Sequence, residues 1–240
     1  MSTLLPEEIQ HLVMMAAHAP SVHNTQPWRF APTSDGLRVE CDRSRQLGVI
    51  DPEGRELLLS CGASLHHLQV AARALGLDAE IAVEVRDDTV ALVRLARGVP
   101  ATEAEVESAV AILHRHTHRG RFTDEAVSAE DLNRVLLAVE SELGLLRVVH
   151  QDELVAVEVV VSRAEQSLQS LDGYAGELAR WLWHGLPDED RGDGLPQDAI
   201  DHDPTRAESL EGRQFDGGPS PPAQDPGCGA PDRRAAYLGW

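Results

Sequence analysis

A long apolar pattern between Glu53 and Leu75 constrains the fold of this 240-residue chain more than any other stretch. Apolar side chains recur there at the spacing of one helix face. These positions are Leu57, Leu58, Cys61, Leu65, Leu68, Ala72 and Leu75. Gly76 follows them as a natural C-terminal cap. Because the middle of the stretch carries few charges, we expect a long helix that lies centrally in the core.

Shorter patterns on both sides of this helix predict further helices and strands. A first helix should run from Pro6 and end before Pro20, because the residue preceding a proline avoids helical angles. The other expected elements are strands at 28–31, 37–41 and 145–149, a hairpin from 81 to 95, and helices at 106–113, 128–139 and from 152 to about 183. These signals lack a regular βαβ alternation, which favours the α+β class.

The charge of the chain excludes several classes of partner. The formal net charge is −19, from 21 basic and 40 acidic residues, and every basic residue is arginine. Such a surface repels nucleic acids and anionic membranes.

No apolar run approaches the roughly 20 residues of a membrane span, and no signal-peptide pattern is evident. Cys41, Cys61 and Cys228 are scattered and form no disulfide framework or zinc motif, so we expect a cytoplasmic protein.

A polar loop between Ala19 and Phe30 is the first candidate binding segment. It carries Ser21, His23, Asn24 and Gln26 between two prolines, followed by an aromatic residue. Small polar side chains on a stiffened loop can hydrogen-bond the edge of a planar ligand. Serine, asparagine and proline are also ordinary turn formers, so a plain turn is the alternative interpretation.

A second candidate segment, residues 114–122, concentrates three arginines and three histidines within nine positions of this acidic chain. Arginine presents a planar fork that can bind phosphate oxygens in pairs, so the segment suits an anion. One alternative is a solvated turn whose arginines pair with acids such as Asp124 and Glu125. A metal site on the three histidines is the other, but no cysteine or acid completes a known spacing, and we expect no metal.

The polar loop resembles a motif of the flavin-dependent nitroreductase family. Pro20-Ser21-x-x-Asn24-x-Gln26-Pro27-Trp28 is similar to the family's Pro-Ser-x-x-Asn-x-Gln-Pro-Trp, and the Val-His inside it is most similar to the Acg branch. The resemblance implies that the loop lies beside the isoalloxazine ring of FMN. Ser21, Asn24 and Gln26 would then hold the ring edge, with His23 near the ring.

The arginine-rich segment resembles the motif Arg-(Arg/His)-Ser-x-(Arg/Lys)-x-Phe of the same family. The resemblance implies that Arg115, His116, Thr117 and Arg119 contact the phosphate, the ribityl chain and the pyrimidine edge of FMN. Threonine replaces serine here and keeps the hydroxyl. Residues 193–196, Asp-Gly-Leu-Pro, are similar to the part of Acg that leads into its lid.

The order of the two motifs is reversed relative to an ordinary nitroreductase. That order resembles the Acg arrangement, which implies a fused pseudo-dimer of two related halves, with the second half incomplete here. The expected division is a first half at 1–100, the start of a second half at 101–185, a lid-like arm at 186–216 and a disordered tail at 217–240.

The resemblance implies an FMN-dependent oxidoreductase that passes electrons from NAD(P)H to a nitroaromatic or quinone-like acceptor. The flavin would carry the chemistry, so no side chain is expected to be catalytic. One alternative is a flavin-binding or flavin-sequestering protein without turnover, and another is an inactive truncated form. The expected state is a monomer, as a pseudo-dimer, or a homodimer.

Overall fold

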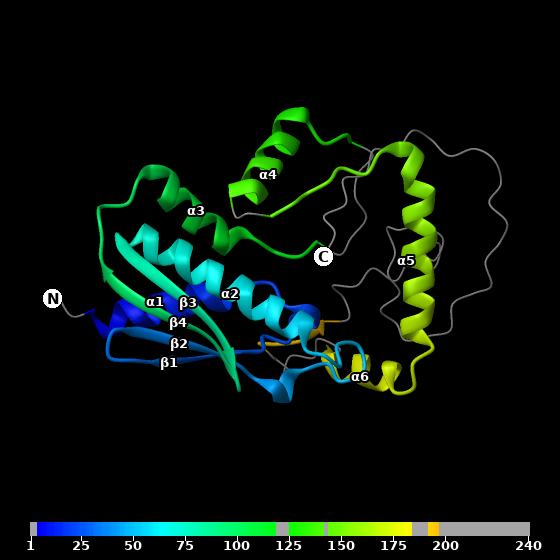
Figure 1. The fold of residues 1–240 in the computed structure, drawn as a ribbon, viewed down its shortest axis with the longest axis horizontal. Coiled ribbons are helices and arrows are strands. Elements are labelled where there is room, and N and C mark those ends of the chain that lie inside the picture. Colours follow the sequence, from blue (N-terminus) through cyan, green and yellow to red (C-terminus); the bar gives the residue numbers. More distant parts are fainter. Residues whose placement is uncertain (1–3, 119–124, 142–143, 184–191, 197–240) are drawn as a thin grey trace. The chain divides into compact units, whose positions relative to one another are not determined.

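The computed structural model describes residues 4–118, 125–141, 144–183 and 192–196 (Figure 1). They belong to two compact units, which we describe separately. The first unit contains the described residues up to 118 and those from 172 onward, and the second contains those from 125 to 171. The expected lid-like arm is therefore described only at 192–196. Arg119, Cys228 and the expected tail lie outside the described residues.

A four-stranded antiparallel sheet forms the base of the first unit. Its strands are β1 (Trp28–Pro32), β2 (Gly36–Cys41), β3 (Leu77–Arg86) and β4 (Thr89–Arg97), in the order β1-β2-β4-β3. Leu37 and Val39 of β2 and Val93 of β4 point into the core, whereas Arg38 and Arg94 are exposed. This alternation buries one face of the sheet and leaves the other in water.

Three helices pack on the buried side of the first unit. They are α1 (Pro6–Ala17), α2 (Arg55–Ala74) and α3 (Glu103–His114). Helix α2 contacts all four strands and both other helices (Figure 1), as expected from its largely apolar inner face. Its bounds confirm the central helix predicted from the periodicity. The mixture of helices and an antiparallel sheet confirms the α+β class.

The first unit also contains a short segment from the later part of the chain. Helix α6 (Tyr174–Trp181) leads into β5 (Leu182–Trp183), which pairs in parallel with β6 (Leu195–Pro196). The buried carboxylate of Glu177 accepts hydrogen bonds from the backbone N–H groups of Val49 (3.0 Å) and Ile50 (2.9 Å). This contact joins α6 to the stretch that precedes α2.

The second unit contains α4 (Ala129–Ser141), a short turn at Gln151–Glu153 and α5 (Leu154–Gln169). The Ser128 hydroxyl accepts from the Asp131 backbone at 3.0 Å and so caps the N-terminus of α4. The strand expected at 145–149 is wrong. No described strand pairs with these residues, and they therefore have no regular structure. The Leu145 side chain is 97% exposed. None of the described helices combines the length and the apolar character needed to span a membrane.

Candidate functional site

The polar loop has a strained backbone. His23, Asn24 and Gln26 all have positive φ angles, of 49°, 54° and 47°. Left-handed conformations cost non-glycine residues on the order of 1 kcal/mol each, asparagine least. The Ser21 hydroxyl stabilises the turn by accepting a hydrogen bond from the Gln26 backbone at 2.9 Å. Three such residues in four positions indicate that a functional constraint, and not only chain reversal, maintains this loop conformation.

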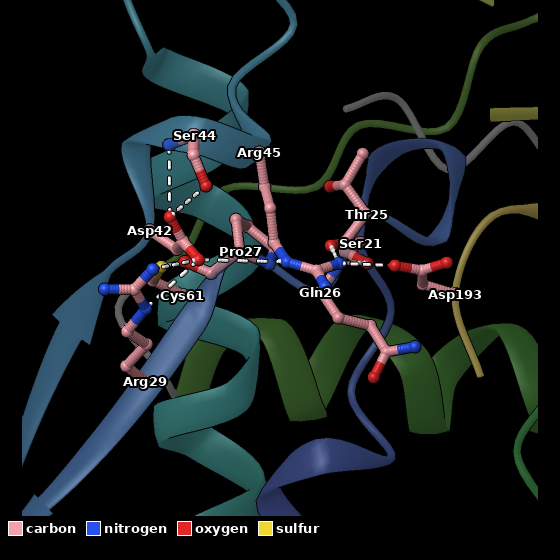
Figure 2. Close-up of polar contacts among 10 residues, drawn as sticks. All are labelled: Ser21, Thr25, Gln26, Pro27, Arg29, Asp42, Ser44, Arg45, Cys61 and Asp193. Atoms are coloured by element: carbon pink, nitrogen blue, oxygen red, sulfur yellow. Dashed lines mark hydrogen bonds and ion pairs between the residues drawn. The ribbon is translucent and has the colours of Figure 1, made fainter. Parts of the chain in front are cut away.

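Buried contacts anchor the loop to β2 and α2. The carbonyl of Pro27 accepts from the Asp42 backbone at 2.8 Å and from the Cys61 thiol at 3.4 Å (Figure 2). The Ser60 hydroxyl of α2 accepts from the Val22 backbone at 3.4 Å. Burial raises the pKa of Cys61 to about 12, so its thiol stays protonated and can donate. Cys61 is therefore a structural contact of the loop.

A charged network lies beside the loop at the end of β2 (Figure 2). The Asp42 carboxylate accepts from Arg29 Nη2 at 2.6 Å and from the Ser44 hydroxyl at 2.6 Å. Burial alone would raise the pKa of Asp42, but the hydrogen bonds from Ser44 and Arg29 hold it below its ordinary value. Asp42 thus stays ionised, with Arg45 Nε 3.8 Å away from its carboxylate.

Arg45 links the loop to the segment Gly192–Gly194. Its Nη1 donates to the Thr25 carbonyl and to the Asp193 carboxylate, both at 2.7 Å (Figure 2). The Asn24 side-chain amide donates to the Gly194 carbonyl at 3.1 Å, and the Gly194 N–H donates to the Asn24 carbonyl at 3.1 Å. The Gln26 amide donates to the Gly192 carbonyl. Two of the side chains expected at a flavin ring thus bind this segment.

Gly194 fits its place only as glycine. Its φ is +78°, and an added Cβ would lie 2.7 Å from the Trp181 carbonyl oxygen. The same Cβ would contact the Trp183 ring at 3.4 Å. The Trp183 indole nitrogen is buried and has no hydrogen-bond partner among the described residues. The segment is therefore closely packed where it meets the loop.

The arginine-rich segment begins at the C-terminal end of α3. Arg115 Nη2 donates to the His18 carbonyl at 3.1 Å, and His18 lies at the end of α1, just before the polar loop. Burial lowers the pKa of Arg115, although a guanidinium stays charged at any physiological pH. His116 and Thr117 are exposed. The structure thus places Arg115 beside His18, at the N-terminal end of the loop, whereas Arg119 lies outside the described residues.

His67 is a buried residue that sequence reasoning missed. Its Nδ1 atom has no hydrogen-bond partner in the described part of the chain. Burial, reinforced by the nearby charges of Arg115 and His66, lowers its pKa from the ordinary 6.5 to about 4. A hydrogen bond to the Met15 backbone opposes this shift only in part. His67 is therefore neutral at pH 7, and only its His-His position in an apolar helix could have drawn attention to it.

Arg45 and Asp193 were also missed as a pair, because 148 positions separate them in the sequence. Within the described ranges, no group of three or more histidine, cysteine or acidic side chains could hold a metal ion. The histidines at 114, 116 and 118 are exposed at the end of α3. The described site is thus built from amides, hydroxyls, arginines and the carboxylates of Asp42 and Asp193.

Comparison with known proteins identifies relatives of this chain. No family model matches the chain. A protein of Mycobacterium tuberculosis H37Rv, "Putative NAD(P)H nitroreductase Rv3131", is 32% identical over 186 residues, which cover 75% of this chain and 53% of that protein. The chain belongs to the nitroreductase superfamily. "Putative NAD(P)H nitroreductase acg" of the same organism is 42% identical over 73 residues, 30% of this chain and 22% of that protein, so Acg-like proteins are among its relatives.

The chain spans about half the length of the curated relatives it matches. Among solved structures, a nitroreductase family protein from Streptococcus pneumoniae covers 42% of this chain and 84% of its own, with 16% identity and a TM-score of 0.34. Membership of the superfamily rests on the sequence relatives rather than on this partial structural likeness.

Proposed function

We propose that this chain is an FMN-dependent oxidoreductase that uses NAD(P)H to reduce a flat acceptor such as a nitroaromatic or a quinone. The observation that carries the proposal is the strained polar loop, with Arg115 at its entrance, in a chain related to proteins named NAD(P)H nitroreductases. The proposal includes a cytoplasmic location and two related halves fused in one chain. It leaves open whether the chain is a monomer or a homodimer.

The donor groups of the site suit a ligand with a planar ring and a phosphate. When bound, FMN supplies two-electron redox chemistry between a nicotinamide and an organic acceptor. Ser21, Asn24 and Gln26 would orient the ring edge. The imidazole nitrogens of His23 and His116 would lie near the ring as hydrogen-bonding groups.

The phosphate end would be held by Arg115, with His116, Thr117 and Arg119 beside it. Arg115 uses Nη1 and Nη2 for Thr117 (3.5 Å) and His18 (3.1 Å). A guanidinium carries five N–H donors, so others remain for phosphate oxygens. In a chain with a net charge of −19, such a cation is the natural place for an anionic ligand.

Flavin binding tests the proposal directly. Purified protein should quench FMN fluorescence and show a bound-flavin visible spectrum, and Arg115→Ala should weaken FMN binding about tenfold, because a charge-assisted phosphate contact is lost. Arg94→Ala is the matched control, since Arg94 lies on the solvent face of the sheet. A protein that stays colourless and does not quench FMN would overturn the proposal.

A second candidate function is flavin binding without turnover. It is favoured by the contacts of Asn24 and Gln26 with the Gly192–Gly194 segment, since a segment held on the loop can restrict access of a nicotinamide. Steady NAD(P)H consumption with a nitroaromatic or a quinone would exclude this alternative. Bound FMN with no NAD(P)H oxidation would support it.

A further inference from the structure

Three hydrogen bonds join the segment Gly192–Gly194 to the polar loop, and an ion pair joins the segment to Arg45. Two of the hydrogen bonds are exchanged between Asn24 and Gly194, the third joins Gln26 to Gly192, and the ion pair joins Arg45 to Asp193. All four contacts join residues more than 140 positions apart, so none of them follows from local chain geometry. The tertiary fold of the first unit therefore sets the place of the segment beside the loop.

Arg45 occupies the central position in this assembly. Its Nη1 contacts both partners at once, the loop through the Thr25 carbonyl and the segment through the Asp193 carboxylate (Figure 2). Thr25 is buried, and Arg45 and Asp193 are each mostly shielded from water. An ion pair that is partly withdrawn from water is screened less than one on the open surface.

We propose that Arg45 is a positioning residue which, through Asp193, latches the Gly192–Gly194 segment onto the loop and keeps it there when flavin binds. Besides orienting the ring edge, Asn24 and Gln26 donate their side-chain amides to the latched segment and set its place at the ring side of the site. The proposal rests on the proposed function for its consequence, the retention of flavin. The latch itself is a property of the chain alone.

Amide hydrogen exchange measures the latch without reference to activity. In full-length protein labelled with ¹⁵N-glycine, the Gly194 N–H should exchange slowly, because it donates to the Asn24 carbonyl. Arg45→Ala and Asp193→Asn should each speed this exchange about fivefold, as expected for the loss of a partly shielded ion pair. The double variant should add little to either single variant, since the two residues act as a pair.

Arg43→Ala is the matched control. Arg43 lies in the same short 3-10 helix as Arg45 (Arg43–Arg45) but contacts Gln46 at 3.3 Å and Asp88 at 3.5 Å instead of the segment. It should leave the Gly194 exchange rate unchanged. Circular dichroism of each variant identifies any general unfolding, and Asp193→Asn keeps the size of the side chain in case Arg45→Ala does not fold.

Adding FMN tests whether the latch persists when flavin binds and whether it slows the dissociation of flavin. Saturating FMN should leave the Gly194 N–H protected, and FMN should dissociate about fivefold faster from the Arg45→Ala variant. Unchanged Gly194 exchange in both single variants, or loss of its protection on FMN addition, would overturn the latch. If the unsubstituted protein binds no FMN, the proposed function fails, and the exchange rates alone still decide the latch.

Discussion

At the residue scale, Gly194 has the strictest steric requirement near the site. Alanine there would place a methyl carbon 2.7 Å from the Trp181 carbonyl and would have to adopt a φ of +78°. We expect Gly194→Ala to cost about 1–3 kcal/mol in the free energy of unfolding or in docking of the segment. Thermal unfolding and exchange of the loop amides would measure this cost.

Gly192→Ala is the control for this substitution. In the part of the chain that the structure describes, a Cβ at Gly192 would have no atom within 4 Å. It should leave both measurements close to those of the unsubstituted protein. Equal effects at the two glycines would show that backbone freedom, rather than the close approach to Trp181, explains the requirement.

His67 provides a prediction about pH. Its pKa falls from 6.5 to about 4 in the folded protein, so the unfolded chain binds the proton first as the pH drops. Its contribution to stability is therefore fully present above about pH 6.5 and is lost progressively toward pH 4, to a total of about 3 kcal/mol. Urea unfolding at several pH values should show a shallower decline for His67→Gln than for the unsubstituted protein.

The neighbouring His66 serves as the comparison, because it is exposed on the same helix. His66→Gln should retain the steep decline between pH 6.5 and 4. Identical slopes for the His67→Gln variant and the unsubstituted protein would contradict the inference that a buried neutral imidazole contributes to the pH dependence.

At the scale of elements, α2 carries the core of the first unit. Leu68 is fully buried among α1 and the strands, whereas Leu59 of the same helix is 58% exposed. We expect Leu68→Ala to lower the free energy of unfolding by about 2–5 kcal/mol and Leu59→Ala by less than about 1 kcal/mol. Equilibrium urea unfolding of the two variants tests this difference, and equal losses would contradict the assigned inner face.

The elements differ in how far the sequence predicts them. The helix predicted over 53–75 was confirmed at Arg55–Ala74, because its apolar face repeats over five turns and Gly76 ends it. The strand predicted at 145–149 was wrong. An apolar run makes a strand only where a neighbour completes its hydrogen bonds, and none of the described strands does so there.

At the scale of the whole molecule, the division of the described chain does not follow the order of the sequence. Residues from 172 onward join the first unit, while those from 125 to 171 form the second. Helices α5 and α6 therefore belong to different units, although both lie within the helical region that the sequence predicts from 152 to about 183. The boundaries expected for fused halves remain predictions, since they concern homology rather than compactness.

For the molecule as a whole, the features that the sequence determines differ from those that only the tertiary structure determines. Helices, hairpins and the two motifs could be predicted from the sequence, because periodicity and turn chemistry act over a few residues. Only the tertiary structure showed that Arg45 meets Asp193, that Asn24 and Gln26 bind Gly194 and Gly192, and that His67 is buried. These contacts close loops of more than 140 residues or depend on packing between helices, and no local pattern encodes the partner.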